Sequence, residues 1–334
     1  MSLAVKYRPK KFEDVLGQTL NKKILKAQLK ENDISTGYLF SGGSGVGKTT
    51  IARIFANELN AETIEIDGAS HNGIDQIRQI RENTKMKSMI SNNKVYIIDE
   101  AHQLSKSSFN ALLKTLEEPP EGVVFILATT EPEKIIPTIH TRVQHFEFTR
   151  ISWGEIAGML EMILEKEGQQ IEKEVVEYIA KIADGSVRSA VSILERALKI
   201  ENPTIEEITE LTGSVNYPLI FKLFKSILTS TNPKEVLEIV EKAHQEGKNL
   251  TKLIEQTAKF TVELTKYALF REFDYIRVPT MYEENLNEMV EVVSNSGFRL
   301  RDLFNEFNDL YVSLRYENDE KLLIQGHLMK MMGD

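Results

Sequence analysis

The feature that most constrains the fold of this chain is a glycine-rich loop between a short apolar run and a helical pattern. Residues 38–40 (YLF) lead into SGGSGVGKTT at residues 41–50, which contains a complete phosphate-binding P-loop from Gly42 to Thr49. Glycines let the backbone turn tightly and point its N–H groups at phosphate oxygens, and the following helix adds the positive end of its dipole. A loop that binds nothing is disfavoured, because strand, loop and helix occur in the order that the motif requires.

The side chains of this loop predict how a nucleoside triphosphate would be held. Lys48 is expected to bind the β- and γ-phosphates, and the hydroxyl of Thr49 is expected to bind a magnesium ion. The loop residues predicted to contact the nucleotide are Gly43, Ser44, Gly45, Val46, Gly47, Lys48, Thr49 and Thr50.

Short apolar runs recur along the first 150 residues and alternate with helical stretches. The runs cover residues 38–40, 63–66, 95–98, 123–128 and 143–148. This alternation predicts an α/β fold with a parallel five-stranded sheet and helices on both faces. The runs VYIID and VVFILAT lack polar alternation, as expected for central strands that are buried on both sides. The P-loop is therefore expected at the carboxyl end of a strand, where open α/β sheets bind ligands.

The strand pattern stops after about residue 150, and the rest of the chain is predicted to be helical. Helix breaks are expected at Gly168, Asp184-Gly185, Asn232-Pro233, Gly247, Pro279 and Gly297. We expect a nucleotide-binding domain at residues 1–150, a small helical domain at residues 151–212 and a second helical domain at residues 213–334.

Composition and charge narrow the compartment and the partners. The chain has no cysteine, which excludes disulfides and thiolate zinc sites and fits a reducing compartment. It has neither a signal-peptide pattern nor the apolar run of about 20 residues that a membrane span needs, so we expect a cytoplasmic protein without membrane contact. The formal charge of −9 disfavours general attraction to nucleic acid, so any DNA contact must come from local basic patches.

Two carboxylates follow the apolar run at residues 95–98. Asp99 is expected to help hold magnesium, and Glu100 to orient and partly deprotonate the attacking water. An Asp-Glu pair is common at strand ends, but after a complete P-loop it predicts a site that hydrolyses a nucleoside triphosphate. Asp99-Glu100-Ala101-His102 also matches a helicase box. Because the chain is too short for paired helicase motors, His102 is expected to be a local hydrogen-bonding or packing residue.

Several longer motifs carry a family resemblance. They are KYRPKKFEDVLGQ at residues 6–18, the P-loop, the strand before Asp99-Glu100, SFNALLKTLEEPP at residues 108–120 and LATT at residues 127–130. Together they resemble the clamp-loader branch of the AAA+ ATPases, and within it the motor subunits of bacterial DNA polymerase III clamp loaders. The resemblance is dense across about residues 4–200 and only architectural beyond them. The KTLEEPP and YRP segments make it specific, because they are not general features of P-loop proteins.

The resemblance implies roles for three more polar residues. Thr130 would be the first sensor, whose hydroxyl contacts the γ-phosphate or the attacking water; the alternative is a threonine that merely ends a strand. Arg142 would act in trans, as a planar cation that stabilises charge developing on the neighbouring subunit's ATP. Arg188 would be the second sensor, on the phosphates of its own subunit; the alternative is an exposed helix arginine.

Three neighbouring positions depart from the family pattern. Thr141 replaces the usual serine and Val143 the usual cysteine, but the electrostatic role of this motif belongs to the arginine between them. Ser189 stands where the family commonly has aspartate, which leaves the local pairing beside the second sensor open.

Binding surfaces for the base and for DNA are also implied by the resemblance. The residues that would pack on adenine and ribose are Tyr7, Arg8, Pro9, Leu16 and Gly17; an unrelated N-terminal arm is the alternative. Arg78 and Arg81, three residues apart on a predicted helix, and more weakly Lys106 would contact DNA phosphates. Surface ion pairs are the alternative for these cations.

As a whole, the resemblance implies an ATPase that uses ATP and Mg²⁺. It would assemble with other clamp-loader subunits into a homo- or hetero-oligomer, expected to be pentameric, and place a sliding clamp on primer–template DNA. Residues 151–212 would then form a lid, and residues 213–334 an oligomerisation collar. The family's cysteine-rich zinc module is missing before residues 64–67, so no zinc is expected and the chain resembles a shortened loader of a phage or a divergent lineage.

Two other functions stay open. One is a different AAA+ DNA-maintenance ATPase, such as a branch-migration motor or a fork recombination factor, although such proteins carry extra assembly or DNA-binding regions. The other is a scaffold subunit that binds nucleotide without hydrolysing it. Intact Lys48, Thr49, Asp99 and Glu100 oppose the scaffold.

Overall fold

The structure is a computed structural model that describes residues 2–70, 73, 79–80, 82–84, 91–213, 217–316 and 319–333. Arg78 and Arg81 lie outside the described residues. The chain divides into two compact units. The first comprises Met1–Glu172 and Ile179–Glu201, and the second comprises Lys173–Tyr178 and Asn202–Asp334.

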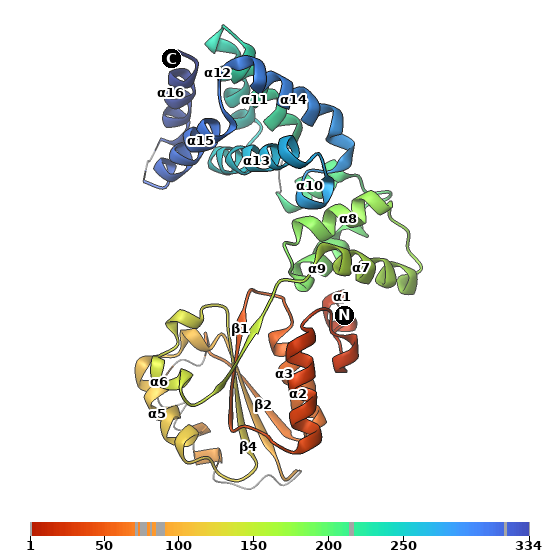
Figure 1. Cartoon of the computed structure of the whole chain (residues 1–334), viewed down its shortest axis with the longest axis vertical. Coiled ribbons are helices and arrows are strands. Elements are labelled where there is room, and N and C mark those ends of the chain that lie inside the picture. Colours follow the sequence, from red (N-terminus) through yellow and green to blue (C-terminus); the bar gives the residue numbers. More distant parts are fainter. Residues whose placement is uncertain are drawn as a thin grey trace. The chain divides into compact units, whose positions relative to one another are not determined.

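A parallel sheet forms the centre of the first unit (Figure 1). Its strands are β1 Gly37–Gly42, β2 Glu62–Asp67, β3 Lys94–Asp99, β4 Val123–Thr129 and β5 Gln144–Phe148. Their spatial order is β2-β3-β4-β1-β5, and every neighbouring pair is parallel. The predicted α/β fold with a five-stranded parallel sheet is confirmed.

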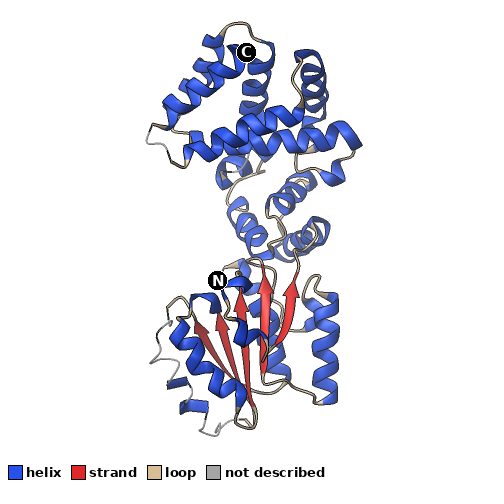
Figure 2. Cartoon of the chain, turned by 60° about the vertical axis from the view of Figure 1, so that its left-hand side comes forward, coloured by secondary structure: helices blue, strands red, loops and turns tan. Residues whose placement is uncertain are grey.

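Alternating side chains of the central strands pack on opposite faces of the sheet. In β1, Tyr38 and Phe40 belong to the apolar core on one face, and Leu39 belongs to the core on the other. Helices cover both faces, as Figure 2 shows: α2 and α3 contribute to the first core, and α5 and α6 to the second. Burial on both sides explains why the strand sequences are apolar without interruption.

Helices of the first unit begin and end at capping residues. Outside residues 71–90, its helices of four or more residues are α1 Leu3–Lys6, α2 Thr19–Glu31, α3 Lys48–Glu58, α5 Lys106–Glu117, α6 Pro137–His140, α7 Trp153–Glu167 and α9 Val187–Ala197. Helix α8, Lys173–Ile182, is divided between the units. Short 3₁₀ turns are η1 Phe12–Asp14, η2 Ala101–Gln103 and η3 Pro132–Lys134. The hydroxyls of Ser105, Ser152 and Ser186 each accept a backbone N–H in the first turn of α5, α7 and α9. Gly168 ends α7 with a φ of 65°, a conformation that glycine adopts readily.

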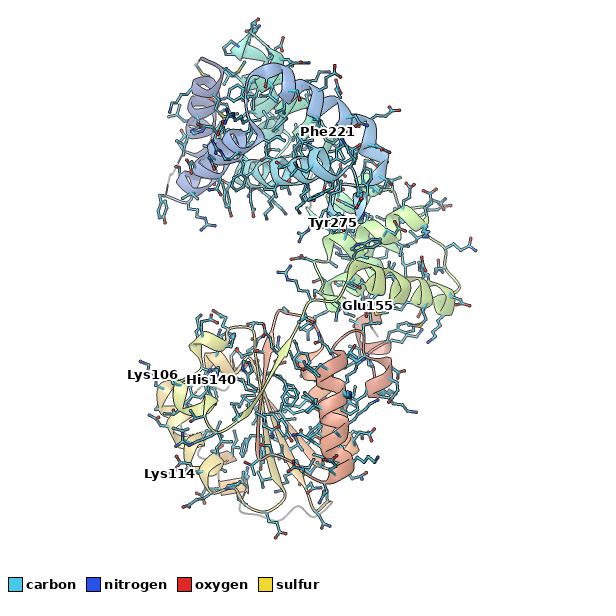
Figure 3. The ribbon with its side chains drawn as sticks, in the orientation of Figure 1. Lys106, Lys114, His140, Glu155, Phe221 and Tyr275 are labelled. Atoms are coloured by element: carbon cyan, nitrogen blue, oxygen red, sulfur yellow. The ribbon has the colours of Figure 1, made fainter. Side chains whose placement is uncertain are left out.

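The described part of the second unit is helical. Its helices are α10 Ile205–Thr212, α11 Tyr217–Thr229, α12 Pro233–Gln245, α13 Leu250–Phe270, α14 Glu283–Ser296, α15 Leu300–Leu314 and α16 Glu320–Gly333, with 3₁₀ turns η4 Phe273–Tyr275 and η5 Thr280–Tyr282. Phe221 of α11, labelled in Figure 3, packs edge-on against Phe260 of α13, which in turn contacts Phe224. These ring contacts join neighbouring helices in one apolar core.

The compact units do not reproduce the predicted domain boundaries. Helices α7 and α9 belong to the sheet-containing unit, whereas α10 belongs to the second unit. Boundaries near residues 150 and 212 therefore stay predictions. Among the described residues, every helix is too short or too polar to cross a membrane.

Candidate nucleotide-binding site

The P-loop connects the end of β1 to the start of α3, and two of its glycines cannot be replaced without movement. Gly42 has a φ of 139°, and a Cβ atom there would lie 2.3 Å from the carbonyl oxygen of Phe148. Gly45 has a φ of 74°, and a Cβ atom there would lie 2.2 Å from Oγ of Ser186. The loop is therefore in close contact with the end of β5 and with the start of α9.

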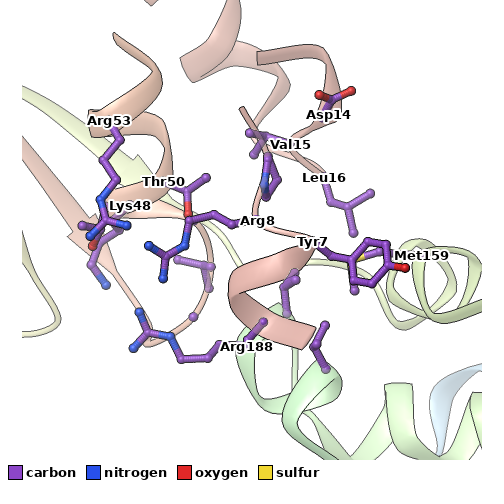
Figure 4. A pocket seen from close by; sticks show the side chains of 18 of the residues that line it. Tyr7, Arg8, Asp14, Val15, Leu16, Lys48, Thr50, Arg53, Met159 and Arg188 are labelled. Carbon is purple, nitrogen blue, oxygen red and sulfur yellow. The ribbon is translucent and has the colours of Figure 1, made fainter. Parts of the chain in front are cut away.

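Beside the P-loop lies a cavity of about 540 Å³, a size typical of small-molecule sites. Figure 4 shows that its two sides differ in chemistry. The cations Arg8, Lys48, Arg53 and Arg188 line one side. Tyr7, Leu16 and Met159 line the other side. A ligand that combines several negative charges with a flat apolar group would match both sides.

Lys48 is held inside the site by backbone oxygens. Its side chain lies at the start of α3, the residue is 6% exposed, and Nζ donates to the carbonyls of Gly42 at 2.7 Å and Gly43 at 2.8 Å. Burial lowers the pKa of Lys48, while the carboxylates of Glu100 and Asp99 act in the opposite direction. Phosphate oxygens beside Nζ would further favour the charged form of this lysine.

Thr49 and Asp99 meet where a phosphate-bound metal ion would be held. The hydroxyl of Thr49 donates to Oδ2 of Asp99 at 2.9 Å, so the first turn of α3 and the end of β3 present two oxygen ligands together. The described residues contain no group of three or more His, Cys, Asp or Glu side chains that could hold a metal. The two oxygens of Thr49 and Asp99 fit Mg²⁺, which keeps several waters and shares its remaining ligands with substrate phosphates.

Glu100 adopts a backbone conformation that is unusual for a residue with a side chain. Its φ is 46° and its ψ is 44°, and its N–H donates to Oδ1 of Asp99 at 3.1 Å. The hydroxyl of Thr130, just beyond β4, donates to Oε2 of Glu100 at 3.3 Å. Thr130 is not among the residues that line the cavity, and this hydrogen bond connects it to Glu100, which is.

Arg188 lies one residue inside the first turn of α9, beside the P-loop. The N–H of Val187 donates to the carbonyl of Gly45 at 3.1 Å, which brings the start of α9 against the loop. The N–H of Ser189 donates to the capping Oγ of Ser186 at 3.3 Å. Ser189, which departs from the family pattern, therefore takes part in the helix cap through its backbone N–H.

The N-terminal segment is tied to α7 across the apolar side of the cavity. Oε1 of Glu167 accepts from the hydroxyl of Tyr7 and from Nζ of Lys6, each at 2.6 Å. These bonds lower the pKa of Glu167 and raise the pKa values of Lys6 and Tyr7. Gly17 does not line the cavity; a Cβ atom there would lie 2.7 Å from Cδ1 of Ile151, so its role is close packing.

Comparison with known proteins gives matches along most of the chain. A family model described as "DNA polymerase III, delta subunit" matches residues 59–152, and one described as "DNA polymerase III clamp loader subunit, ATPase lid domain" matches residues 155–201. DNA polymerase III subunit tau of Bacillus subtilis is 36% identical over 97% of this chain and 62% of that protein. DNA polymerase III subunit gamma of Buchnera aphidicola subsp. Schizaphis graminum is 34% identical over 88% of this chain and 87% of that protein.

The chain belongs to the DNA polymerase III gamma/tau subunit family. The expected membership of the clamp-loader branch is confirmed, and it implies binding of a nucleotide and Mg²⁺. The chain spans 62% of the length of the Bacillus subtilis relative. Among solved structures, the Thermotoga maritima RuvB Holliday junction branch migration motor has a TM-score of 0.54 at 21% identity, covering 73% of this chain and 86% of that one. At this identity the likeness shows a shared AAA+ fold.

Most residues predicted for the nucleotide in this gamma/tau chain come together around the cavity. Those that line it are Tyr7, Arg8, Pro9, Leu16, Ser44, Gly45, Val46, Gly47, Lys48, Thr49, Thr50, Asp99, Glu100 and Arg188. Gly43 lies beside it and accepts from Lys48, whereas Gly17 and Thr130 lie behind the lining. Lys106, labelled in Figure 3, is exposed at the first position of α5.

Arg142 lies at the amino-terminal ends of the strands, whereas the P-loop of the same chain lies at their carboxyl ends. It precedes β5, whose first residue pairs with Tyr38 near the start of β1. The P-loop follows the other end of β1, roughly 17 Å away at the usual rise per residue of a strand. Arg142 donates to the carbonyl of Thr138 at 2.8 Å and pairs with Oε1 of Glu117 at 2.6 Å. This guanidinium therefore cannot reach the nucleotide cavity of its own chain.

Two supporting residues of the gamma/tau site escaped the sequence interpretation. Gly68, after β2, donates its N–H to the carbonyl of Asp99 at 2.8 Å, and a Cβ atom there would lie 2.7 Å from the carbonyl oxygen of Glu100. Gln18 is 6% exposed and its Nε2 donates to the carbonyl of Thr149 at 2.7 Å and, more weakly, to that of Val46 at 3.4 Å. The sequence signal that could have pointed to Gln18 is its place in the LGQ segment at residues 16–18.

Other lining residues escaped the sequence interpretation. Four of them lie within the motif at residues 6–18 but were not assigned to the nucleotide: Lys6, Lys10, Asp14 and Val15. The others come from outside the recognised motifs: Ala4, Arg53, Met159, Met162, Lys166, Val187 and Val191. Met159 and Met162 stand three apart on α7, a spacing that the sequence interpretation could assign only to helix packing.

Proposed function

We propose that this chain is the ATP-hydrolysing motor subunit of a clamp loader. It helps to open a sliding clamp and to place it on primer–template DNA during replication, and it releases the clamp when ATP is hydrolysed. The observation that carries this proposal is the grouping of Lys48, Thr49, Asp99 and Glu100 around one cavity. Membership of the gamma/tau family supports the clamp-loading part.

In this proposal each group has one task at the reacting phosphate. Lys48 binds the β- and γ-phosphate oxygens, and Arg188 contacts the phosphates from α9. Thr49 and Asp99 hold Mg²⁺, which when bound neutralises charge that develops on the phosphate oxygens. Glu100, restrained by Thr130, orients the attacking water and takes up its proton.

The base and ribose occupy the apolar side of the cavity. Tyr7, Pro9 and Leu16 supply this surface together with the missed residues Met159 and Met162. Because Tyr7 is bonded to Glu167 of α7, a bound base would contact both the N-terminal segment and the lid helix. The nucleotide would therefore hold these elements together through its base, and hydrolysis would change the phosphate contacts of Lys48 and Arg188.

Arg142 acts in trans on the ATP of a neighbouring subunit. Two observations support this: its separation from its own cavity, and its place at the surface, where Glu117 and Thr138 fix the guanidinium. The proposed loader is a homo- or hetero-oligomer, pentameric as in the family, with residues 213–334 as its collar. A cation supplied across each interface makes hydrolysis depend on assembly.

DNA contact is proposed for a few cations in each subunit. Lys106 is exposed, and Arg78 and Arg81 are retained in the proposal from their sequence pattern. Such contacts would bind phosphates regardless of sequence and add up around the oligomer. The sliding clamp and other clamp-loader subunits are the proposed protein partners. We infer a cytoplasmic location without zinc or membrane binding, in keeping with a cysteine-free replication protein.

Turnover measurements separate this function from a nucleotide-binding scaffold. ATP hydrolysis is measured for the assembled loader alone and with primed DNA and clamp. We expect a low basal rate that DNA and clamp together stimulate, and retention of ATP but loss of turnover in Glu100→Gln, with the loader trapped on DNA. Zero turnover of the wild-type assembly would instead support a scaffold, and normal turnover of Glu100→Gln would contradict the assignment of the base.

A further inference from the structure

His102 occupies an almost fully enclosed position between the ends of two neighbouring strands. It lies in turn η2, directly after β3, and its side chain is 5% exposed. Ring atom Nδ1 is 3.1 Å from Oγ1 of Thr129, the last residue of β4, and 3.4 Å from Oε2 of Glu100. Ring atom Nε2 is 3.0 Å from Oε1 of Glu131.

The hydrogen bonds around the ring are consistent with one neutral tautomer. The N–H of Glu131 donates to Oγ1 of Thr129 at 3.0 Å, which leaves the threonine hydroxyl proton to be donated to Nδ1 of His102. The other ring nitrogen then carries its proton and donates to the carboxylate of Glu131. The amide nitrogen of Gln103 also lies 2.9 Å from Nε2 of the ring.

This network connects the proposed base to the proposed first sensor. Thr129 is followed by Thr130, whose hydroxyl donates to the same Oε2 of Glu100 that faces His102. On its far side, Glu131 is paired with Lys134 at 2.6 Å, which anchors that end of the network. His102 thus holds the loop after β4 against the turn after β3, with Glu100 between them.

Glu100 needs such a restraint if it is to act as a base. Its side chain is 40% exposed and has several rotatable bonds, and free rotation would move the carboxylate away from the γ-phosphate. The hydrogen bond from Thr130 falls on Oε2, which leaves Oε1 to accept a hydrogen bond from the attacking water.

We propose that His102 is a positioning residue for ATP hydrolysis: it sets the orientation of Glu100 by locking the turn after β3 to the end of β4. This inference rests on the proposed function, in which Glu100 is the base. A purely structural histidine would affect folding without a selective effect on the chemical step. The two roles therefore differ in the kinetic parameter that they change.

The test compares His102→Leu, which fills similar space without hydrogen bonds, with His102→Gln, which keeps a donor and an acceptor. Asn110→Ala, a change of an exposed amide on α5, is the control. Steady-state ATP turnover is measured on the complete loader with clamp and primed DNA, and melting is followed in parallel. We expect His102→Leu to lower kcat about tenfold with KM for ATP unchanged, His102→Gln to recover much of that loss, and Asn110→Ala to behave as wild type.

A folded His102→Leu loader with the kcat of the wild type would overturn the proposal, as would equal losses for both His102 variants accompanied by equal losses of melting temperature. Should His102→Leu fail to fold, Glu131→Gln provides the second test, because this carboxylate is partly exposed and its loss weakens the anchor of the ring. A several-fold lower kcat in Glu131→Gln supports the proposal, and an unchanged kcat contradicts it.

Glu100→Gln is measured in the same assay, because it tests the assignment of the base separately from the positioning role of His102. If Glu100→Gln hydrolyses ATP normally, the proposed base is wrong, and the inference about His102 is wrong with it. If Glu100→Gln is inactive while His102→Leu behaves as wild type, the proposed function stands and only the positioning role is wrong.

Discussion

At the scale of single residues, the site depends as much on backbone constraint as on charged groups. Asp99 and Glu100 present their carboxylates from a turn in which Glu100 has a left-handed backbone conformation. Such a conformation is unfavourable for a residue with a side chain and persists only where neighbours enforce it. Gly68 is one of those neighbours, because its own backbone donates to the carbonyl of Asp99.

The first residue-scale prediction concerns Gly68. In Gly68→Ala the added methyl group would lie 2.7 Å from the carbonyl oxygen of Glu100 and 2.9 Å from that of Asp99. Both contacts are with backbone, so the turn must move, and we expect about 1–3 kcal/mol of destabilisation and a clear loss of ATP turnover. Thermal melting and turnover of the purified loader test this. Gly154→Ala is the matched control, since its added methyl group would meet nothing within 4 Å beyond its chain neighbours and the backbone of its own helix. Equal effects in the two variants would refute the steric argument.

The second residue-scale prediction concerns Lys48. Lys48→Ala removes the ammonium that the carbonyls of Gly42 and Gly43 hold in the cavity. Losing charge-assisted hydrogen bonds to phosphate should weaken ATP binding by about a hundredfold or more. Equilibrium binding of a fluorescent ATP analogue measures this. Lys106→Ala, which removes an exposed lysine outside the cavity lining, should bind ATP as the wild type does; comparable losses in both variants would count against the assignment.

At the scale of helices and strands, the sequence was most informative where local pattern and tertiary burial agree. The central strands could be predicted because both of their faces are buried, which requires continuous apolar sequence. The end of α7 at Gly168 and the start of α12 at Pro233 could be predicted from local backbone preference. The alternating, half-buried β2 was also found, from a short run of β-branched residues.

The supporting parts of the site could not be predicted because their roles depend on contacts between distant segments. Gln18 acts through Thr149, and Gly68 acts through Asp99 and Glu100. Met159 completes the apolar side of the cavity only because α7 packs beside the N-terminal segment. None of these contacts has a local sequence signature, whereas the P-loop and the acidic pair do.

The prediction at this scale concerns how stability depends on pH where β5 pairs with β1. Nε2 of His145 is 2.7 Å from Oγ of Ser41, and partial burial, assisted by His140, lowers the pKa of His145 below its ordinary value of 6.5. As the pH falls through about 6.5, the unfolded chain takes up this proton before the folded chain does, so stability falls in that window. At higher pH both states are neutral and the group contributes no slope.

Replacement of the histidine isolates its share of this pH dependence. His145→Gln keeps an amide that can bond Ser41 but does not titrate. We expect the melting temperature of the variant to change less than that of the wild type between about pH 7.5 and pH 5.5. Differential scanning calorimetry at both pH values tests this, and identical drops for the two proteins would mean that His145 has no part in the acid sensitivity.

At the scale of the whole molecule, the proposed function requires each nucleotide site to be completed by a neighbouring chain. The cavity gathers the P-loop, the acidic pair and Arg188, whereas Arg142 lies at the amino-terminal ends of the strands. The predicted role in trans requires that separation. In this chain the guanidinium of Arg142 contacts Glu117 and Thr138, and the proposed oligomer would bring it to the ATP of a neighbouring subunit.

The most direct test of this account mixes two inactive variants, Glu100→Gln and Arg142→Ala, in one assembled loader and measures ATP turnover. Each variant alone should be inactive. In the mixture, an Arg142→Ala chain supplies an intact Glu100 and an adjacent Glu100→Gln chain supplies an intact Arg142, so turnover should reappear at the hybrid interfaces. A mixture whose native mass proves co-assembly but whose turnover stays at the level of the separate variants would contradict the account.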